Sequence, residues 1–254
     1  MPDKGGVAIF SSLYKKYWQI GFTTRLYEWL CPEAYLDSLR RVAESIPRDE
    51  EGLILDAGCG SGMLLPFLAD RLGSGTRYLG LDILPTGLAS LEEKARQLGA
   101  SQSVATLQGD LSRPLSMKDH TVNYAAAHFS IYTLPAEHER QRVYRELFRV
   151  VKPGGLLVTA NPTSGYDAEA IIRQSVESLR GKMSSRRLWA TKNLLYPLTL
   201  RLGLKHIERQ ISAGTWHGYA PDELNSDIES AGFSIDHTEA VYAGSGLLVV
   251  ARKP

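Results

Sequence analysis

The sequence predicts an α/β fold with a seven-stranded, mostly parallel sheet and helices on both faces. Apolar segments alternate with helical segments from residue 53 to residue 160, which is the pattern of a parallel sheet with helical connections. Three of the predicted strands also end on an acidic residue, namely Asp56, Asp82 and Asp110. Because parallel strands end at the same edge of a sheet, we expect the three carboxylates at one edge, where ligands bind.

The first predicted strand, residues 52–57, leads directly into a glycine-rich loop. Gly58, Gly60 and Gly62 occupy alternate positions of this loop. Glycine tolerates backbone conformations that other residues avoid and lets the main chain approach a ligand closely. A helix over residues 63–72 is expected next, with its free N–H groups facing that ligand. The segment is therefore predicted to bind a cofactor.

The closest competing pattern is the dinucleotide-binding fingerprint Gly-x-Gly-x-x-Gly. Counted from Gly58, its third glycine would fall on Met63, whereas the glycine here is one residue earlier, at Gly62. With the preceding Asp56, the loop resembles motif I of the class I S-adenosylmethionine (AdoMet) dependent methyltransferases. An ordinary glycine turn between a strand and a helix is the remaining alternative.

This resemblance implies a role for each acidic residue. Asp56 and the glycines would shape the pocket for the methionine part of AdoMet, and Asp110 would bind the adenine amino group. Asp82 would hold the ribose, since a carboxylate can accept hydrogen bonds from two neighbouring hydroxyls, a feature shared with NAD enzymes. Each acid alone would also suit a helix cap. The expected cofactor contacts are Tyr17, Asp56, Gly58, Cys59, Gly60, Gly62, Asp82, Ile83, Asp110, Leu111 and Ala127.

The second half of the predicted core contains another similarity to the same family. A fourth strand is expected over residues 121–128, followed by a helix over 137–151 and a strand over 156–160. Residues 147–155, Leu-Phe-Arg-Val-Val-Lys-Pro-Gly-Gly, closely resemble the family's turn before the fifth strand. The run after the fourth strand matches only loosely.

The C-terminal end also resembles the family. A helix over residues 221–231 and strands over 233–242 and 246–253 would supply the antiparallel pair that closes a seven-stranded methyltransferase sheet. Four parts are thus expected, in order an N-terminal helical lid (1–48), an AdoMet-binding core (49–160), a helical substrate-cap insertion (161–220), and the C-terminal helix and strand pair (221–254).

Residues 11–46, before the first strand, are expected to be helical and are rich in aromatic residues. In one interpretation the rings pack a helical cover onto the core. In the other the segment is a lid, and its rings face the sulfonium of AdoMet through cation–π attraction. Tyr14, Tyr17 and Trp18 are the candidates for this second role.

The predicted insertion is far longer than an ordinary connection. Between Ile171 and Ile211 nine basic residues occur with two acidic ones, on a chain of net charge +1, and leucines are interleaved with them. The alternatives are a cap with a solvated basic face, a surface for an anionic or lipid-like acceptor, and peripheral membrane contact through residues 171–211. Nucleic acid is not an expected partner, because leucines dominate and no binding motif occurs.

Methyl transfer from a sulfonium mainly requires in-line positioning and exclusion of water. A base helps when the acceptor atom is a hydroxyl or an acidic carbon, and the candidates are His128, Tyr132, His217 and Tyr219. The loop after the fourth strand lacks the Asn/Asp-Pro-Pro-Tyr/Phe motif of methyltransferases that act on planar nitrogen.

The sequence therefore predicts AdoMet-dependent methyl transfer to oxygen or carbon of a small, apolar or amphipathic acceptor. A protein that binds AdoMet or its product S-adenosylhomocysteine without catalysis, as a sensor or partner, is the alternative. An NAD-linked oxidoreductase is disfavoured by Met63.

Composition indicates the compartment. The chain has two cysteines, Cys31 and Cys59, which suits a reducing cytoplasm and supplies no cysteine cluster for a metal. No apolar stretch approaches the roughly 20 residues of a membrane span, and the first residues lack the apolar core of a signal peptide. We expect a cytoplasmic protein without a metal, with peripheral attachment to a membrane as the alternative.

Overall fold

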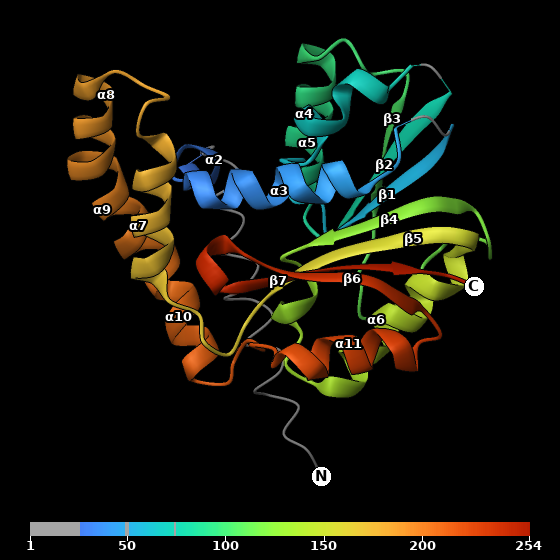
Figure 1. Cartoon of the computed structure of the whole chain (residues 1–254). Helices are drawn as coiled ribbons and strands as arrows, with labels where there is room; N and C mark the ends of the chain where they lie inside the picture. The colour runs from blue at the N-terminus through green and yellow to red at the C-terminus, as the bar shows by residue number, and fades with distance from the viewer. Residues whose placement is uncertain (1–25, 49–50, 74) are drawn as a thin grey trace.

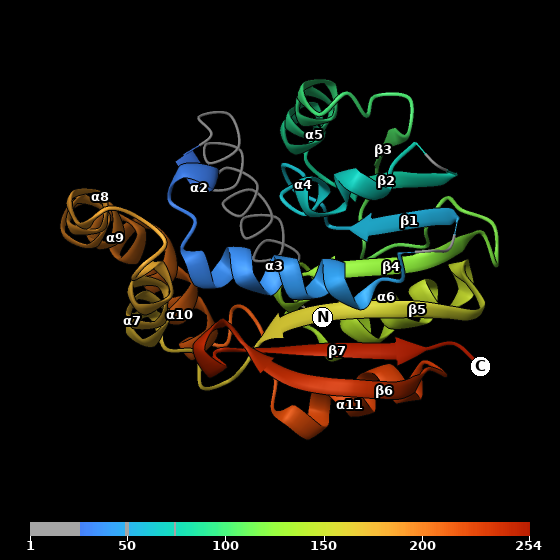
Figure 2. The same ribbon diagram turned by 45° about the horizontal axis from the view of Figure 1, so that its top comes forward.

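The computed structural model describes residues 26–48, 51–73 and 75–254 of the chain. Seven strands form one sheet in the order β3-β2-β1-β4-β5-β7-β6 (Figures 1 and 2). Strands β1 to β5 run parallel, and β7 lies antiparallel between β5 and β6. The predicted seven-stranded, mostly parallel fold is confirmed. The strands are β1 (Gly52–Ala57), β2 (Thr76–Asp82), β3 (Val104–Gln108), β4 (Val122–His128), β5 (Val151–Pro162), β6 (Ser234–Val241) and β7 (Gly246–Arg252).

Helices cover both faces of the sheet because successive strand side chains point to opposite sides. Leu55 of β1 and Ala125 of β4 belong to the core on the face that α6 and α11 cover. Ile54 and Ala126 belong to the core on the other face, which α3, α4 and α5 cover. Figure 1 shows α3 on one side of the sheet and α6 and α11 on the other. The first group is α3 (Glu33–Ser45), α4 (Leu65–Leu68) and α5 (Pro85–Gln97), and the second is α6 (Glu137–Val150) and α11 (Pro221–Ser230).

Helix α3 is part of the core. Its Leu39 and Val42 are fully buried, and the guanidinium of Arg71 donates hydrogen bonds to the carbonyls of Ala43 and Ile46 at its C-terminal end. This favours the packing interpretation for the part of the aromatic segment that α3 contains. The lid candidates Tyr14, Tyr17 and Trp18 lie outside the described residues, which begin with α2 (Leu26–Trp29), so the lid stays a prediction.

The helix after the glycine loop is shorter than the predicted segment 63–72. Only Leu65–Leu68 is α-helical, as α4, and a 3-10 turn, Ala69–Arg71, follows it. The prediction of a ten-residue helix was wrong because the loop extends through Leu64, and the helix begins beside Pro66, whose missing N–H is tolerated in a first turn.

Strand β5 begins earlier than predicted. Val151 pairs with Val122 and Leu156 pairs with Tyr124, so residues 152–155 form a bulge within the strand instead of a turn before it. Gly154 has φ of +78°, a conformation that glycine adopts without steric cost, and it lies within this bulge.

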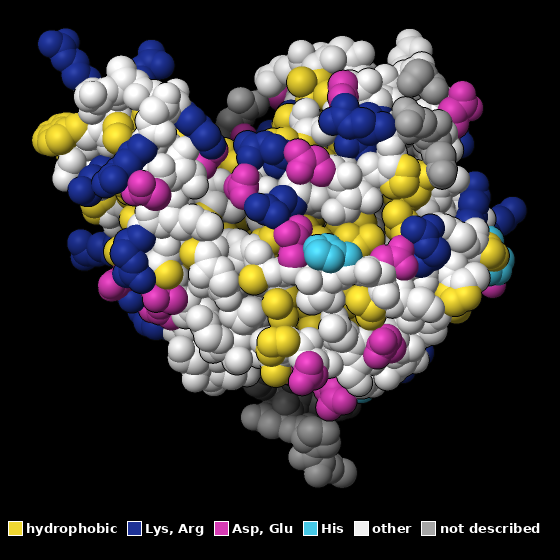
Figure 3. Space-filling model, in the orientation of Figure 1, with side chains coloured by type: hydrophobic (Ala, Val, Ile, Leu, Met, Phe, Trp, Pro, Cys, Tyr) yellow, Lys and Arg dark blue, Asp and Glu magenta, His cyan; other side chains and the backbone are white. Residues whose placement is uncertain are grey.

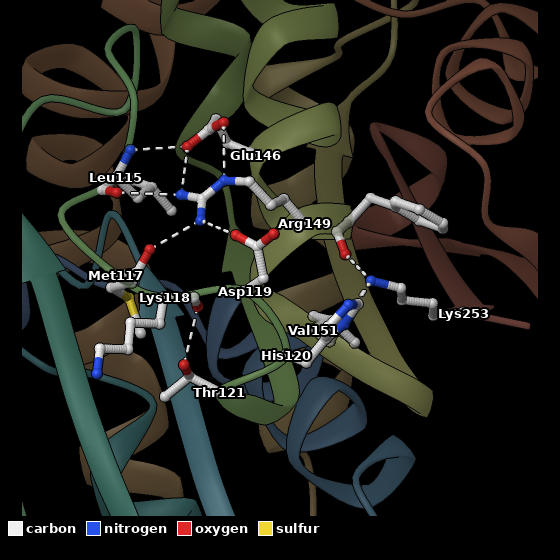
Figure 4. A network of polar contacts seen from close by, with 11 residues as sticks. Leu115, Met117, Lys118, Asp119, His120, Thr121, Glu146, Arg149, Val151 and Lys253 are labelled. Carbon is white, nitrogen blue, oxygen red and sulfur yellow. Dashed lines mark hydrogen bonds and ion pairs between the residues drawn. The ribbon is translucent and has the colours of Figure 1, made fainter.

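Arg149, at the end of α6, holds together the edge of the sheet where β4 and β5 begin (Figure 4). Its guanidinium donates hydrogen bonds to the carboxylates of Glu146 and Asp119, at 2.8 and 2.7 Å. It also donates to the carbonyls of Leu115 and Met117. The network ties the β3–β4 connection to α6, at the edge opposite the strand-terminal acids. We assign it to stability.

The predicted helical insertion after β5 is a hairpin of two helices. Its first helix is α7 (Ala168–Leu179), and its second runs from Ser185 to Ser212 without interruption. This second helix consists of α8 (Ser185–Ala190), the π-helical η3 (Thr191–Leu195), α9 (Tyr196–Thr199), the π-helical η4 (Leu200–Leu204) and α10 (Lys205–Ser212). We call residues 168–212 the arm. Figures 1 and 2 show it standing beside the sheet.

The arm is attached to the core through α3. The main-chain N–H of Ala34 donates to Ser175 Oγ on α7, at 3.0 Å, and the N–H of Glu33 donates to the hydroxyl of Tyr196. Both bonds satisfy N–H groups of the first turn of α3, which have no partner within the helix. Within the described part of the chain, none of the helices combines the length and apolar character needed to cross a membrane.

Candidate active site

The glycine loop and the acid that ends β2 are joined by hydrogen bonds. The main-chain N–H of Gly60 donates to Asp82 Oδ2 at 2.9 Å, and the N–H of Leu84 donates to Oδ1 at 2.8 Å. Burial raises the pKa of Asp82 above its usual value, although these N–H bonds act in the opposite direction. A strand end, a loop and a helix start thus share one carboxylate.

All three glycines of the loop have left-handed backbone conformations. Their φ angles are +81° at Gly58, +52° at Gly60 and +75° at Gly62, which side chains other than glycine adopt only with strain. A Cβ at Gly58 would also collide with Ser130, and one at Gly62 with Leu91. The alternate glycines are therefore required both by the turn and by close packing.

Two hydroxyls beside the loop were not predicted from the sequence. Ser61 Oγ and Thr86 Oγ1 are buried and have no hydrogen-bond partner among the described residues. Ser61 lies within the loop, and Thr86 precedes Gly87, where a Cβ would come 2.7 Å from the carbonyl of Gly60. Buried hydroxyls without partners cost free energy, so a polar ligand over the loop would explain both. The position of Ser61 between two glycines was the available signal.

Asp56 and Cys59 are buried next to the loop. The hydroxyl of Tyr78 on β2 donates a hydrogen bond to Asp56 Oδ2. Burial raises the pKa of Asp56 to about 7, and the Tyr78 hydrogen bond opposes this shift. Burial also raises the pKa of the Cys59 thiol well above its usual value. Asp56 is thus held by β2 below the loop, and Cys59 is a packed thiol that remains protonated.

Asp110 follows β3 at the same edge of the sheet. Its Oδ1 accepts hydrogen bonds from the N–H and the hydroxyl of Ser112, at 2.9 and 2.7 Å, while Oδ2 lies 3.8 Å from Nε of Arg113. Leu111 lies beside the loop, 3.4 Å from the position of a Cβ on Gly58. The adenine contact of Asp110 stays a prediction.

Three further residues of the expected cofactor set have different surroundings. Ile83 is half-buried directly after Asp82, and its carbonyl accepts a hydrogen bond from the side chain of Gln108. Ala127 is fully buried in β4, and its carbonyl accepts from Thr159 Oγ1 at 3.0 Å. Tyr17 lies outside the described residues. Their cofactor contacts stay predictions.

His128, the last residue of β4, is buried against α3. Its Nε2 lies 2.8 Å from Ser38 Oγ, and that hydroxyl donates its only hydrogen to the carbonyl of Tyr35, also at 2.8 Å. Nε2 must therefore carry the imidazole hydrogen, which leaves the lone pair on Nδ1. Nδ1 is buried and has no hydrogen-bond partner among the described residues. Burial lowers the pKa of His128 to about 3, so the ring is neutral.

The imidazole belongs to an aromatic cluster. The cluster consists of Tyr35, His128, Phe129, Tyr166 and Tyr242. Ring centroids lie 4.8 Å apart for Tyr35 and His128, 5.1 Å for Phe129 and Tyr242, and 6.0 Å for Tyr166 and Tyr242. Phe129 and Tyr242 have φ of +47° and +56°. Bulky residues in this conformation cost about 1–3 kcal/mol each, and such strain concentrates at functional sites.

The other candidate bases lie elsewhere. Tyr132 is buried in the core on the side of α6 and α11, where its ring meets that of Trp216 edge-on at 5.5 Å. His217 Nε2 lies 2.6 Å from Glu223 Oε1 of α11, and burial lowers its pKa although Glu223 opposes this. Tyr219 is fully buried. Tyr132 also meets Phe129 of the aromatic cluster edge-on, with ring centroids 6.5 Å apart, whereas His217 and Tyr219 pack against each other.

Among the described residues, no group of three or more His, Cys, Asp or Glu side chains is arranged to hold a metal ion. The polar atoms at the loop and at His128 suit an organic ligand with hydroxyl and amino groups. This geometry agrees with the similarity found when the chain is compared with known proteins, in which residues 54–155 match the methyltransferase domain family. Residues 54–155 match a methyltransferase domain, and the sheet that contains them has the class I methyltransferase fold.

Curated relatives of this methyltransferase domain act on different compounds, by their names. A demethylmenaquinone methyltransferase from Bacillus cytotoxicus is 34% identical over 43% of this chain and 45% of its own length. A sterol 4-C-methyltransferase from Caenorhabditis elegans is 29% identical over 54% of this chain and 40% of its own length. A phosphatidylethanolamine N-methyltransferase from Cereibacter sphaeroides is 30% identical over 49% of this chain and 58% of its own length. The chain spans about half the length of these relatives.

Solved structures share the fold of the methyltransferase domain and of most of the chain. The putative methyltransferase in complex with the Trm112 activator of Haloferax volcanii has a TM-score of 0.63 at 16% identity, covering 93% of this chain and 97% of that one. A geranyl diphosphate methyltransferase in complex with GPP and sinefungin has a TM-score of 0.59 at 14% identity, covering 86% of this chain and 78% of that one. At these identities the likeness establishes the fold.

Proposed function

We propose that the protein is an AdoMet-dependent methyltransferase that transfers a methyl group to oxygen or carbon of a small, apolar or amphipathic acceptor. The observation that carries this proposal is the glycine loop, bonded to Asp82 and flanked by the buried hydroxyls of Ser61 and Thr86, within a methyltransferase domain. When bound, AdoMet supplies a methyl group that is already activated on a sulfonium.

The residues at the loop fit the polar parts of this cofactor. Each Asp82 oxygen accepts one N–H bond in the structure and keeps a further lone pair, so the two oxygens can accept the two ribose hydroxyls. The Ser61 and Thr86 hydroxyls can bind polar groups of the methionine part or of the ribose. Asp110, which follows β3, would accept a hydrogen bond from the adenine amino group.

His128 is our proposed base. Its Nδ1 lone pair lies within the aromatic cluster and is not used by the described residues, so it can accept a proton from a hydroxyl or an acidic carbon. Because burial lowers its pKa to about 3, the ring stays neutral, with the Nδ1 lone pair unprotonated, throughout the physiological pH range. The low pKa also makes it a weak base, which suits an acceptor that is itself acidic.

The aromatic cluster favours an apolar acceptor. Its rings form an apolar environment around His128, and the strained Phe129 and Tyr242 place it at the ends of β4 and β6. The names of the three relatives refer to demethylmenaquinone, a sterol and phosphatidylethanolamine, all of them lipid-like compounds. These observations support an amphipathic acceptor without selecting one.

The test is calorimetric titration of the protein with AdoMet, S-adenosylhomocysteine and NADH in parallel. Micromolar binding of the two sulfur compounds, with none of NADH, is expected. Binding of NADH instead would overturn the proposal in favour of an oxidoreductase.

Radiolabelled AdoMet, incubated with organic and aqueous fractions of a cell extract, then tests transfer. Label is expected in the organic fraction, on an ether, ester or carbon-bound methyl. Cofactor binding without transfer to either fraction would favour a sensor.

A further inference from the structure

The second helix of the arm, Ser185–Ser212, exposes large apolar side chains that a helix of a water-soluble protein normally buries. Trp189 is 62% exposed, Leu194 60% and Leu198 43%. Leu194 and Leu198 are four residues apart and therefore lie on one face of the helix. Trp189 precedes them in the same uninterrupted helix, in α8, while Leu194 lies in η3 and Leu198 in α9.

The same stretch is strongly basic. Between Glu177 and Glu208 the chain carries seven Lys and Arg residues and no acidic one, although the whole protein has a net charge of only +1. The cations near the ends of this stretch are neutralised, since Arg180 pairs with Glu177 and Lys205 with Glu208. Arg186, Arg187, Lys192 and Arg201 are exposed, and no ion pair within the described residues involves them.

The exposed apolar and basic side chains lie where the arm stands clear of the sheet. Figure 3 shows Lys and Arg side chains beside exposed hydrophobic ones on the projecting arm, and the surface is hollowed between the arm and the part of the core that carries α4 and α5. The base of the arm reaches the aromatic cluster, because Tyr166 comes directly before α7 and Ser175 binds the first turn of α3.

We propose that residues 186–201 of the arm are a docking surface for an anionic lipid bilayer. Trp189 and the leucines would enter the interfacial region, while Arg186, Arg187, Lys192 and Arg201 would contact acidic headgroups. Tryptophan prefers this region, and basic residues are attracted to its negative potential. Docking there would hold the aromatic cluster near the membrane, where an amphipathic acceptor resides.

The charges favour a bilayer over a second copy of the chain. Two arms packed face to face would bring the four cations of each copy together without any acidic residue between them, and this repulsion opposes such a dimer. An anionic bilayer provides the opposite charge together with an apolar layer for the leucines.

The test is flotation of the full-length protein with vesicles of phosphatidylcholine alone and of phosphatidylcholine with one quarter phosphatidylglycerol. We expect binding to the anionic vesicles only. The triple variant Arg186→Gln, Arg187→Gln, Lys192→Gln should weaken it on the order of a hundredfold, since each cation contributes about fivefold. The double variant Trp189→Ser, Leu194→Ser should weaken it tenfold or more.

The matched control is the triple variant Arg77→Gln, Lys118→Gln, Arg145→Gln, which removes the same charge from exposed positions of the core. It should bind as the wild type does. Equal loss in this control, equal binding to neutral vesicles, or unchanged binding of both arm variants would overturn the proposal. So would a wild-type dimer in sedimentation velocity that the Trp189→Ser, Leu194→Ser variant converts to a monomer.

These measurements need neither AdoMet nor an acceptor, so their outcome is separate from that of the proposed function. Titration of each variant with AdoMet shows whether its core is intact.

Discussion

Nε2 of His128 lies 2.8 Å from Oγ of Ser38, a contact that joins β4 to α3 across 90 residues of sequence. Since the Ser38 hydroxyl donates to the carbonyl of Tyr35, the imidazole must donate to Ser38. Two residues thereby select the tautomer of His128 and leave Nδ1 as the acceptor. This relationship distinguishes His128 from His217, the other histidine considered as a base.

The tautomer can be observed directly. Nitrogen-15 NMR of the protein at pH 7 should show His128 as a neutral ring with hydrogen on Nε2, and the variant His128→Gln identifies the signal by removing it. Ser38→Ala removes the acceptor of the Nε2 hydrogen, so the two tautomers should both become populated. A charged ring, or hydrogen on Nδ1 in the wild type, would contradict the assignment of Nδ1 as the base.

Burial of His128 should make stability depend on pH. Its pKa is lowered to about 3 in the folded protein from an unfolded value of 6.5. Between these values the unfolded chain binds more protons, so the free energy of unfolding falls as pH falls, by up to about 1.4 kcal/mol per pH unit from this group. Urea unfolding of His128→Gln between pH 4.5 and 6.5 should show a correspondingly smaller slope.

The exposed His237 provides the control for this measurement. His237→Gln should keep the wild-type slope. Asp56 acts in the opposite direction, because its raised pKa of about 7 gives stability that is present at low pH and lost as pH rises through 7. Its contribution is the same in all three proteins and cancels in the difference. An equal slope in His128→Gln and the wild type would mean that His128 is not buried.

Asp82→Ala should raise the AdoMet dissociation constant tenfold or more, which corresponds to about 1.4 kcal/mol. The substitution removes the proposed acceptor of two ribose hydroxyls and also releases the N–H of Gly60 from the loop. Calorimetric titration measures the change. Asp70→Ala, at an exposed acid outside the site, is the control and should bind AdoMet as the wild type does. Unchanged affinity in Asp82→Ala would exclude the ribose contact.

Gly62 and Gly99 have similar backbone conformations, so their alanine variants distinguish the cost of backbone strain from the cost of a steric collision. Gly62 has φ of +75° and Gly99 of +68°, but a Cβ would meet Leu91 at Gly62 and nothing within 4 Å at Gly99. Both alanine variants should lose about 1–2 kcal/mol of unfolding free energy through the left-handed conformation. Gly62→Ala should lose about 1–3 kcal/mol more through overpacking and should bind AdoMet more weakly.

Denaturant unfolding and AdoMet titration of the two glycine variants test this prediction together. Gly99→Ala should keep the wild-type affinity for AdoMet. If the two variants were equally stable and bound AdoMet equally, the tight contact between the loop and Leu91 of α5 would not exist in solution.

Much of the fold was predictable from the sequence because its signals are local. Apolar strands ending at Asp56 and Asp82, alternate glycines and the periodic helix of residues 137–151 each report their own backbone preference. Element lengths were less predictable, since the helix after the loop was shortened to Leu65–Leu68 and β5 took in the bulge at Gly154. The residues at which a helix or strand begins and ends depend on the packing of neighbouring elements.

By itself, the sequence determined the sheet, the glycine loop, the strand-terminal acids and the basic, leucine-rich insertion. Only the tertiary structure decided which candidate base has an available nitrogen, that the buried hydroxyls of Ser61 and Thr86 have no hydrogen-bond partner among the described residues, and that Trp189 and Leu194 are exposed. The reason is physical. Hydrogen bonding and burial depend on contacts such as that of Ser38 with His128, between residues far apart in the chain, and local periodicity carries no record of them.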